Sequence, residues 1–176
     1  MIYLCYMYKE YSPCSVLAPF IYHFWEYKGE TRNGLKFNIP PHGCSDFVFI
    51  VGNAADCIRN SLIMKPYHSY FFGPMNTFTE LVAHTNFIHI IGVRFRPCGL
   101  FQFIEIPLNE LANQGIDSQE FPVLFSQSFI YQLCESNQNP IDIIEHELVR
   151  QVYKNNMDTE KQISYAVSLI SRQKGI

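Results

Sequence analysis

The chain of 176 residues is 48% hydrophobic and 15% aromatic, so it can bury one substantial core and is not a disordered protein. Thirteen Lys and Arg residues against sixteen Asp and Glu residues give a formal charge of −3, which argues against a free-standing DNA-binding domain. No apolar run reaches the length of about eighteen residues that a membrane span needs, and the first residues lack a signal-peptide pattern, so we expect a cytoplasmic protein without a membrane partner.

From Tyr11 to about Pro107, short apolar or alternating runs are separated by Gly, Pro and Asn, a pattern typical of antiparallel sheets. The predicted strands are Ile21–Lys28, Leu35–Ile39, Asp46–Val51, Ser61–Lys65, Tyr67–Phe72, Phe78–Ala83 and Phe87–Phe95. Seven strands suit an antiparallel barrel or sandwich, and the high aromatic content favours strands over a helical bundle.

The clearest strand is Phe87–Phe95, because both of its faces are apolar for most of its length. This pattern predicts a central strand that is covered on both sides. Arg94 and Arg96 lie on one face at its end. Beside Asp46 or Glu80, these arginines could hold an anionic group of a ligand or form a structural salt bridge that pins the turn.

Beyond Pro107 the apolar residues recur at intervals of three and four, which predicts helices. Asn139 can cap a helix that begins at Pro140. The buried stripe of this helix is predicted to be Ile141, Ile144, Leu148 and Val152. The predicted helical segments are Leu108–Ala112, Phe121–Glu135, Pro140–Val152 and Glu160–Gln173. The apolar stripes of the last two helices could pack on the sheet or on a second subunit.

Aromatic residues of the predicted strands are numerous enough to line a cavity, although a filled core would need the same residues. The aromatic set is Trp25, Tyr27, Phe37, Phe47, Phe49, Tyr70 and Phe72. The candidate ligand-binding residues are Trp25, His42, Asp46, Phe49, Tyr70, Phe72, Arg94 and Arg96.

Neither metal ligands nor a catalytic nucleophile stand out in the sequence. The six histidines contain no His-x-His pair, and the six cysteines show no zinc-like spacing, so we predict no metal, no cofactor and no enzyme. Ser45 and Cys98 lack a nucleophile elbow of the Gly-x-Ser-x-Gly kind. Cys98 could be a redox sensor only if Arg96 lowered its pKa.

A series of short motifs follows a fixed order along the chain. The motifs are Pro13, Leu17, Phe20-Ile21 and Phe24-Trp25; then Ile39-Pro40-Pro41-His42-Gly43-Cys44-Ser45-Asp46; then Phe72-Gly73-Pro74; then Gly92-Val93-Arg94-Phe95-Arg96-Pro97-Cys98-Gly99; then Ile106-Pro107 with Glu110-Leu111; and finally Asp158 to Ile176. The ordered set resembles the AraC-type transcription regulators, and it departs from them at His42, where Asp is usual, and at Cys98, where Gly is common.

This resemblance implies an α+β fold, namely a cupin-like antiparallel β-barrel or sandwich followed by a C-terminal helical segment. It divides the chain into a β-rich sensor domain at 1–107, a helical dimerisation or linker segment at 108–154, and the first helix of a truncated DNA-binding domain at 155–176. It implies a small-molecule effector, a homodimer, and DNA contact only through helix-turn-helix units that the 176 residues do not contain. The alternatives are a cupin-like metal-dependent enzyme and a dimerisation module without an effector.

Overall fold

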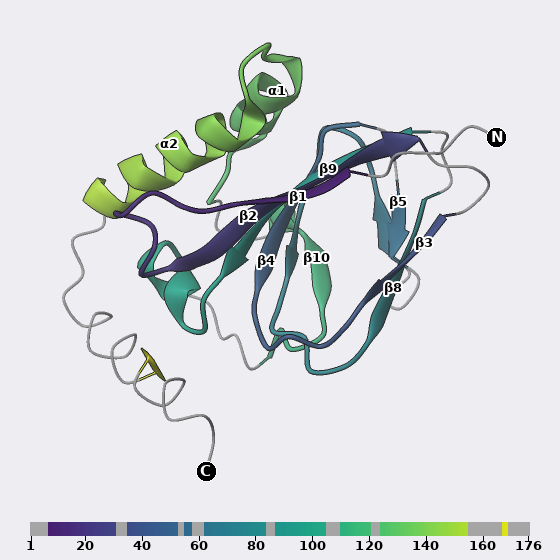
Figure 1. Ribbon diagram of the computed structural model, residues 1–176, viewed down its shortest axis with the longest axis horizontal. Coiled ribbons are helices and arrows are strands. Elements are labelled where there is room, and N and C mark those ends of the chain that lie inside the picture. Colours follow the sequence, from purple (N-terminus) through teal and green to yellow (C-terminus); the bar gives the residue numbers. More distant parts are fainter. Residues whose placement is uncertain are drawn as a thin grey trace.

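The computed structural model describes residues 7–30, 35–52, 55–57, 62–83, 87–104, 110–120, 124–154 and 167–168. Within these residues the strands form two antiparallel sheets (Figure 1). The six-stranded sheet contains β1 (Met7–Tyr11), β2 (Ile21–Glu30), β9 (Phe87–Phe95), β4 (Asp46–Ile50), β7 (Ser69–Phe72) and β10 (Gly115–Asp117), in that order. The four-stranded sheet contains β3 (Leu35–Ile39), β8 (Thr79–Ala83), β5 (Ala55–Cys57) and β6 (Leu62–Met64).

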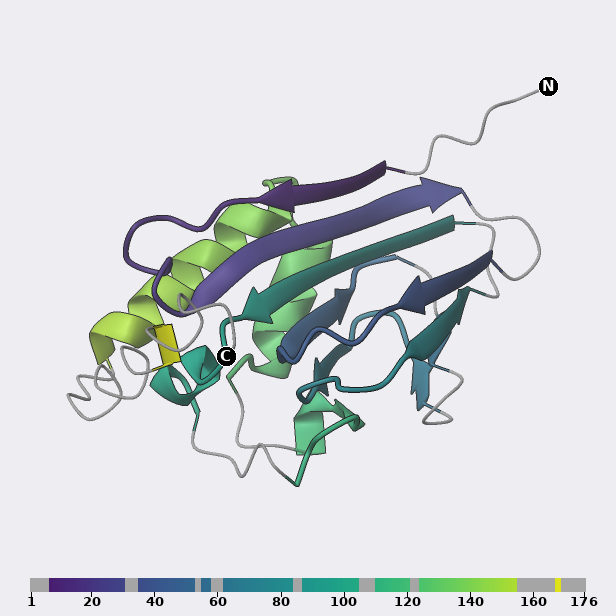
Figure 2. The ribbon, with the colours of Figure 1, turned by 60° about the horizontal axis from the view of Figure 1, so that its bottom comes forward.

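The helical elements of the described residues follow or interrupt these strands. They are the short 3-10 helices η1 (Gly99–Gln102) and η2 (Ser118–Glu120) and the α-helices α1 (Gln127–Glu135) and α2 (Pro140–Lys154). Figures 1 and 2 show α1 and α2 on one side of the six-stranded sheet and the four-stranded sheet on the other. The fold is therefore an α+β sandwich with a C-terminal helical segment, as predicted.

Two hydrophobic clusters lie on the opposite faces of the six-stranded sheet. The cluster on the helix side joins Phe47, Phe49 and Val93 of the sheet to Ile144 and Leu148 of α2. The cluster between the sheets contains Val48, Ile50, Tyr70, Phe72, Leu81, Ile88 and Ile90. Successive residues of one strand point to opposite faces, so β4 contributes to both clusters. All five of its residues are buried.

Each of the seven predicted strands has a counterpart, and Leu35–Ile39 and Phe87–Phe95 match at both ends. The central position predicted for Phe87–Phe95 is confirmed, because β9 lies between β2 and β4 with a hydrophobic cluster on each face.

Three strands were not predicted: β1, β5 and β10. The last two contain only three residues each, too few for a periodic pattern. Strand β10 pairs with β7 and continues the sheet past residue 107, into a segment that was predicted to be helical.

Helix α2 confirms the predicted cap and stripe. The Asn139 side-chain oxygen accepts a hydrogen bond of 3.1 Å from the Ile141 amide at the start of the helix. Ile141, Ile144 and Leu148 are buried, and Val152 packs against the same cluster. The predicted helix Glu160–Gln173 lies outside the described residues apart from the helical residues 167–168. Within the part of the chain that is described, no helix combines the length and apolarity needed to cross a membrane.

Candidate functional site

The pairing of strands places polar residues in one row across the six-stranded sheet. His23 of β2 lies opposite Arg94 of β9, Arg94 lies opposite Asp46 of β4, and Asp46 lies opposite Phe72 of β7. Directly opposed residues of antiparallel strands project to the same face. The row therefore faces the second sheet, on the side away from the helices.

The next row on the same face of the sheet consists of a tryptophan, a glycine and a valine. Trp25 lies opposite Gly92, and Gly92 lies opposite Val48. A Cβ atom at position 92 would come within 1.9 Å of Trp25 Cε2 and 2.2 Å of Trp25 Nε1. The indole therefore lies flat across β9 in space that only glycine leaves open.

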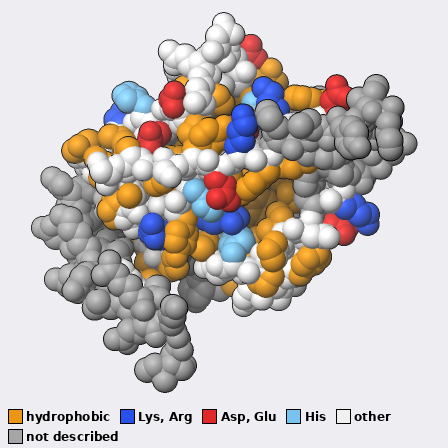
Figure 3. All heavy atoms as spheres, viewed as in Figure 1, with side chains coloured by type: hydrophobic (Ala, Val, Ile, Leu, Met, Phe, Trp, Pro, Cys, Tyr) orange, Lys and Arg blue, Asp and Glu red, His pale blue; other side chains and the backbone are white. Residues whose placement is uncertain are grey.

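These two rows form one wall of a cavity of about 410 Å³ between the sheets, a volume within the usual range for small-molecule sites. Its aromatic lining consists of Tyr8, Trp25, Tyr27 and Phe72, and its aliphatic lining of Ile39, Pro40, Val48, Met75, Leu81 and Ile90. Asn38, Asp46 and Arg94 supply the polar lining. Figure 3 shows charged and histidine side chains gathered beside a hollow with hydrophobic walls. The cavity is thus apolar with one polar end.

The polar end is organised by an ion pair. Arg94 Nε donates to Asp46 Oδ1 at 2.9 Å, and Arg94 Nη2 donates to Asp46 Oδ2 at 2.8 Å. The Asp46 side chain is 7% exposed and that of Arg94 is 21% exposed. Burial acts to lower the pKa of Arg94, but the hydrogen bonds and charge of Asp46 outweigh it and raise the pKa above the ordinary value. The guanidinium is therefore a fixed cation at the cavity wall.

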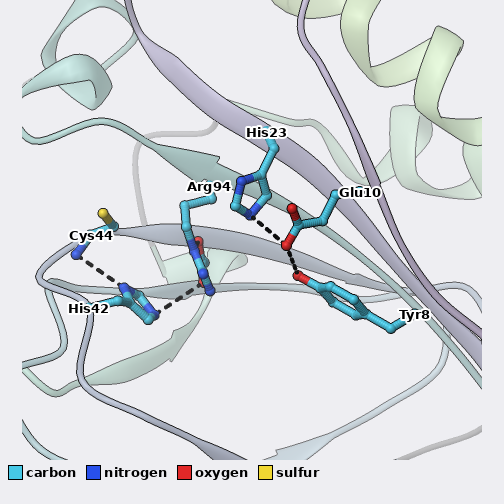
Figure 4. A network of polar contacts seen from close by, with 7 residues as sticks. Tyr8, Glu10, His23, His42, Cys44 and Arg94 are labelled. Atoms are coloured by element: carbon cyan, nitrogen blue, oxygen red, sulfur yellow. Dashed lines mark hydrogen bonds and ion pairs between the residues drawn. The ribbon is translucent and has the colours of Figure 1, made fainter.

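Two histidines stand beside this ion pair, as Figure 4 shows. His42 Nδ1 accepts a 3.1 Å hydrogen bond from the Cys44 amide, and His42 Nε2 lies 3.6 Å from Asp46 Oδ2. His23 Nε2 lies 3.9 Å from Glu10 Oε1. Burial lowers the pKa of both histidines, so both are neutral near pH 7.

The edge strand β1 adds a further aromatic side chain. Tyr8 stacks on Trp25 with 6.5 Å between ring centroids and donates a 2.8 Å hydrogen bond to Glu10. Burial, followed by the hydrogen bond to Glu10, raises the pKa of Tyr8 to about 12. Tyr8 is 52% exposed and lies at the rim of the cavity.

A second polar network lies on the helix side of the sheet. His89 Nε2 is 2.8 Å from Glu26 Oε1, and the Tyr11 hydroxyl donates to Glu26 Oε2 at 2.7 Å. Burial lowers the pKa of His89 and raises the pKa of Tyr11, the latter to about 12. Because its members bond to one another, this network reads as a structural one.

Four of the eight predicted ligand-binding residues line the cavity: Trp25, Asp46, Phe72 and Arg94. His42 lies next to them without lining it. Gly92, His23 and Tyr8 could not be identified as site residues from the sequence, since their contribution depends on strand register.

The other three predicted residues lie elsewhere. Phe49 is fully buried on the helix face, because it alternates with Val48 along β4. Tyr70 packs in the core between the sheets, and its hydroxyl accepts a 2.7 Å hydrogen bond from the Lys65 amide. Arg96 follows the end of β9, donates to the Ala18 carbonyl oxygen and stacks 4.3 Å above Tyr22. Its role is therefore architectural, and it does not share a site with Arg94.

Metal binding and thiol redox chemistry would need particular arrangements of histidine, cysteine and carboxylate side chains. Within the described residues, no group of three or more His, Cys, Asp or Glu side chains could hold a metal ion. Cys98 adopts a left-handed backbone with φ of 63°, and burial raises the pKa of its thiol. This direction is opposite to the one that a redox-sensing thiol would need.

The fold and the cavity together define an antiparallel β-sandwich protein with an inter-sheet pocket of small-molecule size. Residues 9–117 match the family described as Domain of unknown function (DUF6597), and the chain belongs to that family. The matched region ends at Asp117, the last residue of β10, so it follows the sheets and stops before α1. No curated protein matches the chain.

Proposed function

We propose that this chain is the regulatory domain of an AraC-type transcription regulator, the part that senses an effector and forms a dimer as distinct from the part that reads DNA. The observation that carries the proposal is the cavity itself. It combines apolar walls, one polar end and an open rim, whereas a purely structural sandwich would fill this space with side chains.

Successive side chains of β4 point to opposite faces of the sheet, so this strand connects the cavity to the helices. Asp46 and Val48 face the cavity, while Phe47 and Phe49 face the opposite side of the sheet. There both phenylalanines pack on Phe125, with ring centroids 5.4 and 4.9 Å apart. A ligand that shifts β4 therefore also changes the packing just before α1.

The order of sequence motifs supports the same proposal. The segments that resemble AraC-type sensors include the residues before β4 and the end of β9, and Ile39, Pro40 and Arg94 of these segments line the cavity. In such a regulator the effector must favour one arrangement of sheet and helices, because equal affinity for both arrangements would not switch it.

The proposed dimer would use the helical segment. Tyr131 of α1 and Tyr153 of α2 are 52% and 71% exposed, so the outer surface of this segment carries aromatic side chains that a partner could cover. Sedimentation velocity of the purified chain measures this directly, and a monomer at all concentrations would contradict the dimer.

A thermal-shift screen tests the sensor function. The chain is heated with sugars, aromatic acids, nucleotides and divalent metals in turn. A ligand at a hundredfold its Kd adds about 2.7 kcal/mol of stability, which raises the melting temperature of a domain of this size by roughly 5–10 °C.

Two matched variants separate cavity binding from surface binding. Trp25→Leu removes an aromatic wall of the cavity, and Phe78→Leu replaces an aromatic side chain that is 52% exposed and does not line the cavity. If the chain is a sensor, the ligand-induced rise in melting temperature disappears in the first variant and persists in the second. Stabilisation by metals alone would favour the cupin-like enzyme instead, and the absence of any organic ligand would favour a dimerisation module.

A further inference from the structure

The charged groups that a ligand meets in the cavity are already paired with each other. Among the described residues that line it, Asp46 and Arg94 are the only ones with a charged side chain. Arg94 donates from Nε and Nη2 to the two oxygens of Asp46 at 2.9 and 2.8 Å, so the opposite charges lie side by side in one wall. The net charge of this wall is therefore zero.

The ionisable side chains beside the pair add no charge to the cavity lining. Burial lowers the pKa of His23 and of His42, so both rings are neutral near pH 7. Burial also raises the pKa of Tyr8 to about 12, so its hydroxyl is neutral. The Glu10 carboxylate is not part of the described lining, and its side chain is 53% exposed, so water screens its charge. An ionic head group would thus exchange its hydration for a neutral site, which is costly.

The ion pair nevertheless has unused hydrogen-bonding capacity of both kinds. Arg94 Nη1 makes no hydrogen bond to the described residues. The Asp46 carboxylate has about four acceptor positions, and the guanidinium fork occupies only part of them. A hydroxyl group can donate and accept at the same time, so it matches a wall that offers both. A carboxylate would instead bring a second anion beside Asp46, and an ammonium group a second cation beside Arg94.

The rest of the lining is mostly apolar on both sheets. Trp25, Phe72 and Ile90 belong to the six-stranded sheet, and Ile39 and Leu81 belong to β3 and β8 of the other sheet. Figure 3 shows hydrophobic side chains around the hollow. A sugar carries a hydroxyl on nearly every carbon, and most of these groups would lose their hydrogen bonds to water against such walls without gaining others.

We infer that the ligand of this cavity is an uncharged, largely apolar molecule with one hydroxyl group, which bonds to the Asp46–Arg94 pair while the apolar body lies between the sheets. Carboxylates, amines, sugars and nucleotides do not fit this description. The inference rests on the proposed function, since it names the class of effector.

Three probes with one common body test the head group. They are 3-phenylpropan-1-ol, 3-phenylpropanoate and 3-phenylpropan-1-amine, titrated near neutral pH while the emission of Trp25 is followed. Trp25 is the only tryptophan of the chain and lines the cavity, so its emission reports on binding there. The alcohol should bind at least about tenfold more tightly than either charged probe, equivalent to about 1.4 kcal/mol. Glucose, as a fourth probe, should leave the emission unchanged.

Removing one charge of the pair should change this preference. Asp46→Asn keeps a side-chain oxygen for Arg94 but leaves the guanidinium as an uncompensated cation, so the affinity for the carboxylate relative to the alcohol should rise at least tenfold. Glu147→Gln is the matched control, because it removes the same charge from the pair with Arg150 on α2 and should leave the ratio unchanged. Circular dichroism checks that both variants fold. The comparison of probes on the unmodified chain decides the question alone if Asp46→Asn does not.

The outcomes distinguish the two proposals. If a charged probe binds as tightly as the alcohol, or if the ratio is unchanged in folded Asp46→Asn, the inference is wrong while the cavity remains an effector site. The same holds if the alcohol does not bind and the thermal-shift screen yields a sugar, a nucleotide or a carboxylate whose effect is lost in Trp25→Leu. If neither the alcohol nor any organic compound of the screen binds, both proposals fail.

Discussion

A double-mutant cycle on Arg94 and Asp46 would measure how strongly the polar end of the cavity is built into the fold. The two side chains share a two-pronged hydrogen-bonded contact of 2.8 and 2.9 Å, and the Asp46 side chain is only 7% exposed. Arg94→Met leaves that largely buried carboxylate without its partner. Removing one partner of a buried pair costs about 3–5 kcal/mol, a large part of the 5–15 kcal/mol that stabilises a typical domain.

The double variant Arg94→Met with Asp46→Leu should recover at least about 2 kcal/mol of this loss, because an apolar pair leaves no unpaired charge. Urea denaturation followed by circular dichroism gives the four free energies of unfolding. Arg150→Met is the matched control, since Arg150 pairs with Glu147 on the surface of α2 and its replacement should change stability little. A loss below about 1 kcal/mol in Arg94→Met would show a screened surface pair and refute the description of a desolvated polar end.

Three further predictions test other parts of the structure. Gly92→Ala should displace the Trp25 indole and cost about 1–3 kcal/mol through overpacking, with a shifted tryptophan emission; an unchanged spectrum would contradict the contact. Leu148→Ala should cost about 2–5 kcal/mol in urea denaturation, because this side chain is fully buried under the sheet, and a cost near that of a surface substitution would mean that α2 is not docked. Stability should fall with acid between about pH 7 and about pH 5, because the histidines with lowered pKa values are neutral when folded and take up protons on unfolding; the slope is at most about 1.4 kcal/mol per pH unit for each. These histidines are His23, His42 and His89.

The sign of the pH prediction follows from the direction of the shifts. A lowered pKa in the folded state means that the unfolded chain binds more protons below the ordinary value of 6.5. The contribution of these histidines is therefore complete above that pH and is lost as the pH falls. His89→Gln should make the curve shallower, and a curve of unchanged slope would mean that His89 does not titrate in this way.

Sequence periodicity could predict the strands because most of them carry long apolar or alternating runs. It could not assign faces in β4 and β7, where nearly every residue is apolar and the alternation of polarity disappears. Phe49 was therefore grouped with the cavity although it packs under the helices. Strand register, which no single strand encodes, is what brings His23, Arg94 and Asp46 into one row.

The same limit explains why Arg94 and Arg96 looked equivalent. Alternation places them on one face only if the strand continues through both, but β9 ends at Phe95, and the Arg96 amide bonds to the Phe20 carbonyl oxygen. A bulge between Ile21 and His23 then leaves Tyr22 as the residue beneath the Arg96 guanidinium. Arg96 therefore holds the chain where it enters β2. Arg94, whose Nη1 makes no hydrogen bond to the described residues, is the cation that lines the cavity. The different roles of the two arginines are therefore a tertiary property, set by the end of β9 and by the bulge in β2 rather than by their spacing in the sequence.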